Sequence, residues 1–199
     1  MQDSHNEISE EITGVLLAGG KSIRMGRDKA SIEVSGLTLA ARSLDLLQRY
    51  FSKVVIAGDR PDLARPGVSV LPDIYPGSAM GGLYTALRSA PTDWIFVAPC
   101  DMPYPDSRIL ELLVARRHGY DAVVPKTPEG YEPVFAVYHK RCLPIMESML
   151  KQGNYRIYAF YQRINICYLD WQAMPEGWRR SLLNVNTQED LSHIKERQR

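Results

Sequence analysis

Residues 12–17 read ITGVLL, and residues 18–29 continue as AGGKSIRMGRDK. The first run is short and apolar, which is typical of a strand buried on both faces of a parallel sheet. The second run carries three glycines and four cationic side chains. Glycine lets backbone N–H groups approach an anion without a Cβ in the way, and consecutive N–H groups form a phosphate-sized concavity. The stretch predicts a nucleotide-phosphate site at the carboxyl end of the first strand of an open α/β sheet, with Arg24 and Lys29 supplying charge.

A P-loop is the obvious alternative, because Gly20-Lys21-Ser22 looks like the end of that motif. The motif requires a glycine at the place that Val15 occupies inside the apolar run, so the sequence excludes it. A glycine-rich turn with solvated basic residues stays open as the simpler interpretation.

The composition excludes several classes of protein. The chain has 199 residues, 45% of them hydrophobic, which suits one domain with a sizeable core. Its 24 basic and 23 acidic residues give a net charge of +1, which provides no general attraction to nucleic acid or membranes. The 3 cysteines are odd in number and widely spaced, which favours reduced thiols and matches no zinc motif. We expect a cytoplasmic monomer without nucleic-acid or membrane partners.

Strand patterns alternate with helical ones along the chain, which predicts a mostly parallel sheet with right-handed crossovers. The fold class is therefore α/β, a single Rossmann-like three-layer domain with one or more antiparallel strands in its second half, after Pro125. Residues 1–11 are acidic and polar and are expected to form a disordered tail, followed by a domain over 12–199 with halves at 12–125 and 126–199. The predicted strands are 12–17, 53–57, 68–71, 94–98, 122–124, 134–138 and 164–169, with a short alternating piece at 30–34. The predicted helices are 37–50, 79–89, 107–117, 140–151, 155–162 and one capped by Thr187 with Asp190 in a capping box, and residues 170–180 are predicted to be loop.

Two aspartates follow predicted strands. Asp101 comes after the strand at 94–98, at the sheet edge where the glycine loop lies. Mg²⁺ prefers one or two carboxylates together with phosphate oxygens, so Asp101 is the predicted metal ligand, and a turn or N-cap role is the alternative. Asp73 precedes the turn at 77–83, whose small residues allow a nucleobase or ribose to approach. Tight helix–sheet packing explains the glycines of that turn equally well.

The second half offers candidates for a phosphorylated acceptor. Asn184 and Asn186 are separated by one residue, so their side chains point to the same side of an extended segment, where one could complete a metal shell. Arg156 and the pair at 179–180 could grip an acceptor phosphate, although solvated surface arginines are the commoner case. No nucleophile–base pair is evident, which fits phosphoryl-type transfer.

Together these segments resemble the molybdenum cofactor guanylyltransferase family, within the nucleotidyltransferase superfamily. The resemblance implies that the terminal phosphate of molybdopterin, carrying or receiving molybdenum, attacks the α-phosphate of GTP in the presence of Mg²⁺. Pyrophosphate leaves, a guanine dinucleotide cofactor forms, and the product passes to a molybdoenzyme or a cofactor-insertion protein. The matching segments occur in family order at 17–20, 24–29, 73, 77–83, 99–103, 132–136 and 184–187.

The resemblance also implies which residues act. Catalytic roles fall to Arg24, Lys29, Asp101 and Asn186, with Asp101 as the metal ligand. Nucleotide contacts fall to Leu17, Ala18, Gly19, Gly20, Lys29, Asp59, Asp73, Gly77, Gly82 and Asp101. Acceptor contacts fall to Arg24, Arg156, Asn184 and Asn186.

One position departs from the family pattern. The family often has an asparagine near the base at the end of the second strand, where this chain has Ala57. Asp59 could instead accept hydrogen bonds from guanine N1–H and N2–H₂. A related cytidylyl- or other nucleotidyltransferase acting on a phosphorylated cofactor or sugar therefore stays open, as does a catalytically silent nucleotide-binding module.

Overall fold

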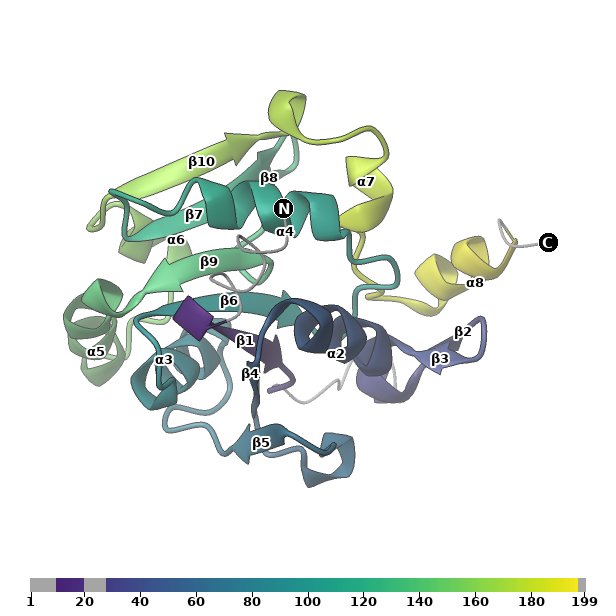
Figure 1. The fold of residues 1–199 in the computed structure, drawn as a ribbon, viewed down its shortest axis with the longest axis horizontal. Coiled ribbons are helices and arrows are strands. Elements are labelled where there is room, and N and C mark those ends of the chain that lie inside the picture. Colours follow the sequence, from purple (N-terminus) through teal and green to yellow (C-terminus); the bar gives the residue numbers. More distant parts are fainter. Residues whose placement is uncertain (1–9, 20–27, 197–199) are drawn as a thin grey trace.

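A single mixed sheet forms the centre of the fold in the computed structural model, which describes residues 10–19 and 28–196 (Figure 1). Its strands are β1 (Ile12–Leu17), β4 (Lys53–Ala57), β5 (Val68–Leu71), β6 (Trp94–Pro99), β7 (Ala122–Thr127), β8 (Gly130–Tyr131), β9 (Ala136–His139) and β10 (Ile166–Asp170). The strand order is β10-β7-β9-β6-β1-β4-β5, and β8 pairs with β7 off that path. The pairs β5–β4, β4–β1, β1–β6 and β7–β10 are parallel, whereas β9 is antiparallel to both β6 and β7. The predicted α/β class, a mostly parallel sheet with antiparallel strands in its second half, is confirmed.

The direction of β9 decides which segments meet at the edge that carries the glycine loop. Val97, near the end of β6, pairs with Ala136, the first residue of β9. The segment that enters β9, residues 132–135, therefore lies at the same sheet edge as the carboxyl ends of the parallel strands.

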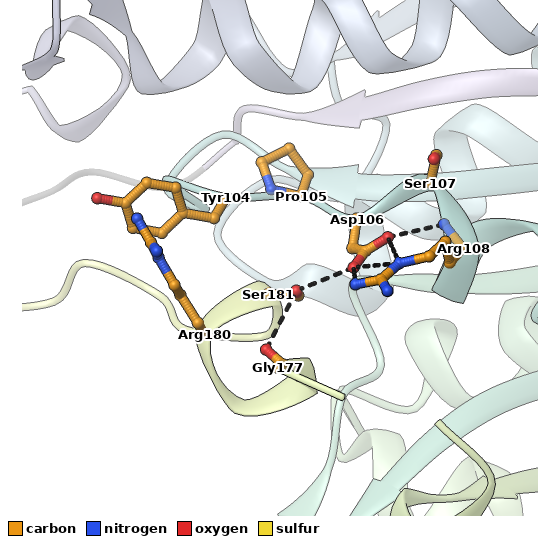
Figure 2. Close-up of a pocket in the computed structure, with 8 residues that line it drawn as sticks. All are labelled: Tyr104, Pro105, Asp106, Ser107, Arg108, Gly177, Arg180 and Ser181. Carbon is orange, nitrogen blue, oxygen red and sulfur yellow. Dashed lines mark hydrogen bonds and ion pairs between the residues drawn. The ribbon is translucent and has the colours of Figure 1, made fainter. Parts of the chain in front are cut away.

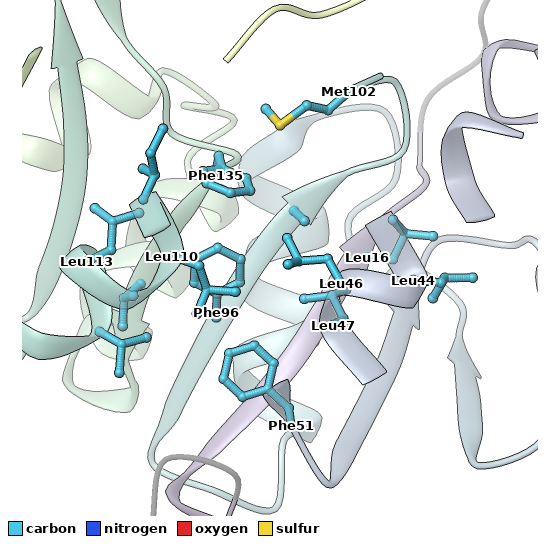
Figure 3. Packing of buried hydrophobic residues seen from close by; sticks show 14 of the residues in the cluster. Leu16, Leu44, Leu46, Leu47, Phe51, Phe96, Met102, Leu110, Leu113 and Phe135 are labelled. Atoms are coloured by element: carbon cyan, nitrogen blue, oxygen red, sulfur yellow. The ribbon is translucent and has the colours of Figure 1, made fainter. Parts of the chain in front are cut away.

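Helices cover both faces of the sheet and make three layers. One face carries α2 (Leu39–Tyr50) and α4 (Ser107–Ala115), and the other carries α3 (Ala79–Ser89), α5 (Leu143–Lys151) and α6 (Ile157–Tyr161). Side chains of a strand alternate between the two faces, so Leu16 belongs to the first cluster while Val15 and Leu17 belong to the second. In the first cluster Phe96 packs between Phe51 and Phe135, with ring centroids 5.7 and 5.1 Å apart (Figure 3).

A third, smaller cluster lies at one end of the molecule. The hairpin of β2 (Glu33–Val34) and β3 (Leu37–Thr38) is next to α8 (Gln188–Glu196) in Figure 1. The members of this end cluster are Ile32, Val34, Leu39, Val185 and Ile194. It ties the C-terminal segment to the chain that follows Lys29.

Local structure differs from the prediction in several places. The strand β8 was not expected, and the helix expected at 140–151 is the 3₁₀ turn η4 (Lys140–Cys142) followed by α5. The piece expected at 30–34 is a 3₁₀ turn, η2 (Lys29–Ser31), followed by β2. The helix expected from residue 37 begins at Leu39, because the Thr38 side chain caps it by accepting a hydrogen bond from the Ala41 N–H at 3.1 Å. The loop expected at 170–180 contains η5 (Trp171–Ala173) and α7 (Trp178–Ser181), and Trp178 is buried in the first cluster.

Other expectations hold in part. Thr187 and Asp190 form the predicted capping box, since the Asp190 N–H donates to Thr187 Oγ1 at 3.1 Å and the Thr187 N–H donates to Asp190 Oδ2 at 2.8 Å. The expected disordered tail is wrong for its last two residues, which are the part of it that the structure describes. They are helical, and Glu11 pairs with Arg117. All 3 cysteines are free. The remaining short elements are η3 (Pro61–Leu63) and η4 (Lys140–Cys142). No helix in the described chain has the length and apolarity that a membrane crossing needs.

Candidate active site

Three segments that are distant in sequence meet around the Lys29 ammonium group. Its Nζ donates to Asn186 Oδ1 at 2.6 Å and lies 3.3 Å from Asp101 Oδ2. Lys29 opens the 3₁₀ turn η2, Asp101 directly follows β6, and Asn186 precedes α8. The structure thus brings together three of the four residues expected to be catalytic.

Backbone pairing fixes the asparagine segment against the end of β6. The Val185 N–H donates to the Asp101 carbonyl at 2.9 Å, and the Val185 side chain is fully buried in the end cluster. Side chains alternate along extended chain, so burial of Val185 turns Asn184 and Asn186 toward the Asp101 side. This agrees with the expectation that the two amides share one side.

Glu132 is a functional candidate that the sequence reasoning did not assign. It lies just before β9, its N–H donates to the Pro125 carbonyl at 3.0 Å, and its half-buried carboxyl hydrogen-bonds the Asn184 side chain. Burial raises the pKa of Glu132 to about 7, the Asn184 hydrogen bond opposes that rise, and the negative charge of Asp101 adds to it. Asn184 Oδ1 is buried without a hydrogen-bond partner among the described residues, and a protonated Glu132 could donate to it.

Two opposing effects act on the pKa of the Asp101 carboxyl. Burial raises its pKa, while the ammonium group and the hydrogen bond of Lys29 lower it. A second carboxyl, Glu132, feels its charge. The edge therefore concentrates negative charge in a place with little solvent, where a cation is strongly stabilised.

A second group of residues lies at the same sheet edge, around Asp73. Asp73 Oδ1 is buried and has no hydrogen-bond partner among the described residues, and burial raises the pKa of this carboxyl. A Cβ on Gly19 would lie 2.5 Å from Asp73 Oδ2, and one on Gly82 would lie 3.0 Å from Leu17 Cδ2 and 3.6 Å from Asp73 Oδ1. The structure thus places Asp73 against the end of β1 and the start of α3.

Gly81 and Gly82 lie in the first turn of α3, and their surroundings differ. A Cβ on Gly81 would lie only 1.8 Å from the backbone oxygen of Tyr75, so this glycine is required by packing alone. Gly82 faces Leu17 and Asp73 and lies at the site. Gly77 is exposed in the turn, with a φ of +92°.

Other predicted residues are less closely connected. Gly20 and Arg24 lie outside the described residues. Asp59 is exposed just past the end of β4. Arg156 is exposed at the start of α6, and no contact joins it to Lys29 or Asp101 within the described chain.

An ion pair between Arg60 and Asp28, which the sequence did not reveal, fixes the residue before Lys29. The Arg60 guanidinium donates to both carboxylate oxygens of Asp28, at 3.0 and 2.6 Å. Asp28 also caps η2 through the Ala30 N–H at 3.3 Å. The residue immediately before Lys29 is therefore fixed to the loop that follows β4.

The MobA-like NTP transferase domain family matches residues 14–165. This chain belongs to that family. A probable molybdenum cofactor guanylyltransferase of Pelotomaculum thermopropionicum is 32% identical over 185 residues, covering 91% of this chain and 90% of the relative. The molybdenum cofactor guanylyltransferase of Vibrio campbellii is 33% identical over 186 residues, covering 90% and 93%. The crystal structure of molybdopterin-guanine dinucleotide biosynthesis protein A from Archaeoglobus fulgidus superposes with a TM-score of 0.77 at 23% identity, covering 92% of this chain and 97% of that one, and shows the shared fold.

Nucleotidyltransferases of this family generally use a divalent metal, and the residues at the edge fit one. The Asp101 carboxylate and the Asn186 amide oxygen already converge on one cationic atom, Lys29 Nζ. Oxygen donors of this kind suit a hard divalent ion. No group of three or more His, Cys, Asp or Glu side chains positioned for a metal occurs in the described chain. A bound ion would therefore rely on phosphate oxygens or water for the rest of its shell.

Proposed function

We propose that this protein transfers GMP from GTP to the terminal phosphate of molybdenum-molybdopterin, releasing pyrophosphate and forming a guanine dinucleotide cofactor. The observation that carries the proposal is the convergence of Lys29, Asp101 and Asn186 at the carboxyl edge of the sheet. The names of relatives more than 30% identical over about nine-tenths of the chain support the nucleotide and the acceptor.

The proposed reaction exchanges one phosphorus–oxygen bond for another. An oxygen of the acceptor phosphate attacks the α-phosphorus of GTP, and the bond from that phosphorus to the bridging oxygen of pyrophosphate breaks. Like charges approach one another in this step, so fixed cations at the developing phosphoryl charge are the main source of acceleration. Lys29, held by Asp101 and Asn186, can provide such a charge, and Arg24 is proposed as a second.

Mg²⁺ is the proposed metal, held by Asp101 together with phosphate oxygens. When bound, it supplies Lewis-acid polarisation of the phosphate oxygens. Lys29 and Asn186 would orient the reacting phosphates. Glu132, through its hydrogen bond to Asn184, holds the acceptor-side amide in place.

The nucleotide is proposed to lie over the ends of β1, β4 and β5. The backbone of residues 17–20 would hold its phosphates, and Asp73, with one oxygen lacking a partner, would accept a hydrogen bond from the nucleoside. Gly77 and Gly82 would leave room for it, and Asp59 would accept from the guanine edge. Arg156 would contribute on the acceptor side.

We also propose a cytoplasmic monomer that passes its labile product directly to a molybdoenzyme or a cofactor-insertion protein.

The test begins with isothermal titration of the purified protein with GTP, CTP, UTP and ATP, each with Mg²⁺. Selective GTP binding followed by Mg²⁺-dependent pyrophosphate release upon addition of molybdopterin would support the proposal. Preference for CTP would instead favour a cytidylyltransferase and would point to Ala57 as its cause. Nucleotide binding without pyrophosphate release in the presence of acceptor would favour a silent binding module.

A further inference from the structure

A pocket of about 510 Å³ lies beside the candidate active site, between the start of α4 and α7 (Figure 2). Residues 104–108 line one wall, and Gly177, Arg180 and Ser181 line the other. Small-molecule sites in proteins occupy about 300–1,000 Å³, so the pocket can take a compact ligand. Of the arginine pair at 179–180 that the sequence suggested for the acceptor, only Arg180 lines this pocket.

The two ends of the pocket differ in charge. At one end the Asp106 carboxylate pairs with Arg108 at 2.7 Å and accepts from Ser181 Oγ at 3.4 Å, which neutralises the Arg108 charge. At the other end the Arg180 guanidinium lies over the Tyr104 ring, 3.9 Å from its centroid, and no carboxylate of the described chain pairs with it. Figure 2 shows Arg180 along Tyr104, away from the Asp106 group. The pocket therefore presents one uncompensated positive charge, spread over a planar group that rests on an aromatic ring.

The pocket adjoins the reacting centre. Tyr104 is three residues from Asp101, so their Cα atoms are at most about 11 Å apart even in fully extended chain. Tyr104 also packs against the end cluster that contains Val185, whose N–H bonds the Asp101 carbonyl. Asp73 follows β5, and the strands β1 and β4 lie between β5 and β6 in the sheet. A ligand in the pocket would thus reach Asp101 from the side opposite the proposed nucleotide.

We propose that this pocket binds the pterin ring of the acceptor, with Arg180 stacked on Tyr104 as its platform. This rests on the proposed function, which places the acceptor phosphate at Lys29 and Asp101. A planar nitrogen heterocycle can stack on the guanidinium face that does not rest on Tyr104. At the far end the Asp106 carboxylate can accept from the ring's amino group, and the Ser181 hydroxyl oxygen can accept from a ring N–H.

The test compares Arg180→Ala with a matched control, Arg179→Ala. Arg179 is the preceding residue of α7 and also lies over aromatic rings, 4.6 Å from the Trp178 centroid and 5.8 Å from that of Trp171, but it does not line the pocket. Steady-state pyrophosphate release gives KM for molybdopterin and for GTP, and equilibrium dialysis of molybdopterin without GTP gives its affinity directly. We expect Arg180→Ala to raise the KM and the dissociation constant for molybdopterin about 10-fold and to leave the KM for GTP unchanged. Arg179→Ala should change neither.

Two results would overturn the assignment of the pocket. One is an unchanged molybdopterin affinity in Arg180→Ala. The other is an equal loss of affinity for both substrates in Arg180→Ala and Arg179→Ala, which would mean that α7 acts only through the fold. Arg180→Lys separates charge from stacking, and recovery of less than half of the lost affinity is the expected result for a stacked platform. Failure of the wild-type protein to release pyrophosphate with GTP and molybdopterin would speak against the proposed function itself.

Discussion

Replacing Glu132 by glutamine should make the protein more stable, and more so as the pH rises. The substitution keeps the shape of the side chain and its contact with Asn184 but removes the titrating carboxyl. Burial raises the pKa of Glu132 from 4.5 to about 7. Between those two values the folded state holds a proton that the unfolded chain has lost, so the stability of the wild-type protein falls as the pH rises through this window.

The size of the effect follows from the shift. A rise from 4.5 to about 7 corresponds to about 3 kcal/mol at ~1.36 kcal/mol per pKa unit. Part of the carboxyl faces solvent, where screening weakens the effect, so about 2 kcal/mol is the better expectation. The stability gained by Glu132→Gln should therefore grow by about 1–2 kcal/mol between about pH 5 and about pH 8.

Denaturant unfolding of both proteins at the two pH values, in buffer with a chelator, measures this difference. The chelator matters because a divalent ion at Asp101 would itself favour the charged form of Glu132. Glu176→Gln, which changes an exposed carboxyl, is the matched control and should show no such pH dependence. A stability gain that is the same at both pH values, or a loss at the higher one, would refute the electrostatic description of Glu132.

Three further substitutions test the site and the packing beneath it. Asp101→Asn should lower the rate of pyrophosphate release by about 10²–10³ while the melting temperature stays close to that of the wild type, because a buried amide avoids the cost of a buried carboxylate. Asp73→Ala should weaken GTP binding in titration calorimetry by about 1–3 kcal/mol, since it removes a hydrogen-bond acceptor with an oxygen free for the nucleoside. Gly81→Ala should destabilise the fold by about 1–3 kcal/mol in denaturant unfolding, because its Cβ would fall 1.8 Å from the backbone oxygen of Tyr75.

Each of these has an outcome that would contradict it. Wild-type turnover in Asp101→Asn would remove this residue from the metal site. An unchanged GTP dissociation constant in Asp73→Ala would show that the nucleoside does not contact it. Ser89→Ala, at the exposed end of the same helix, is the control for Gly81→Ala, and equal stability of the two variants would contradict the close approach to Tyr75.

Much of the sheet could be predicted because its strands are buried on both faces. The apolar runs at 12–17, 53–57 and 94–98 are confirmed as strands at or within one residue of their expected bounds. The helix over 79–89 is confirmed as well, with Ser78 as its cap. Shorter elements were less predictable, because the stability of the hairpin before α2 and of α7 comes from tertiary contacts with buried residues such as Val34 and Trp178 rather than from local pattern.

The part of the candidate site that could be predicted consists of residues that directly follow strands. Asp101 and Asp73 follow strands, and the sheet edge brings both to the glycine loop, although their roles stay predictions. Glu132 could not be found in that way, because it precedes a strand. It reaches the edge only because β9 is antiparallel. Its pKa is raised by burial and lowered by the hydrogen bond to Asn184, a residue far along the chain.

The end cluster connects the last helix to the candidate active site. Ile194 of α8 packs with residues of the β2–β3 hairpin and with Val185, and these two segments carry Lys29 and Asn186 at their borders. A small cluster of this kind can open while the main sheet stays folded. Such an opening would separate the Lys29 ammonium group from the Asn186 amide without unfolding the main sheet.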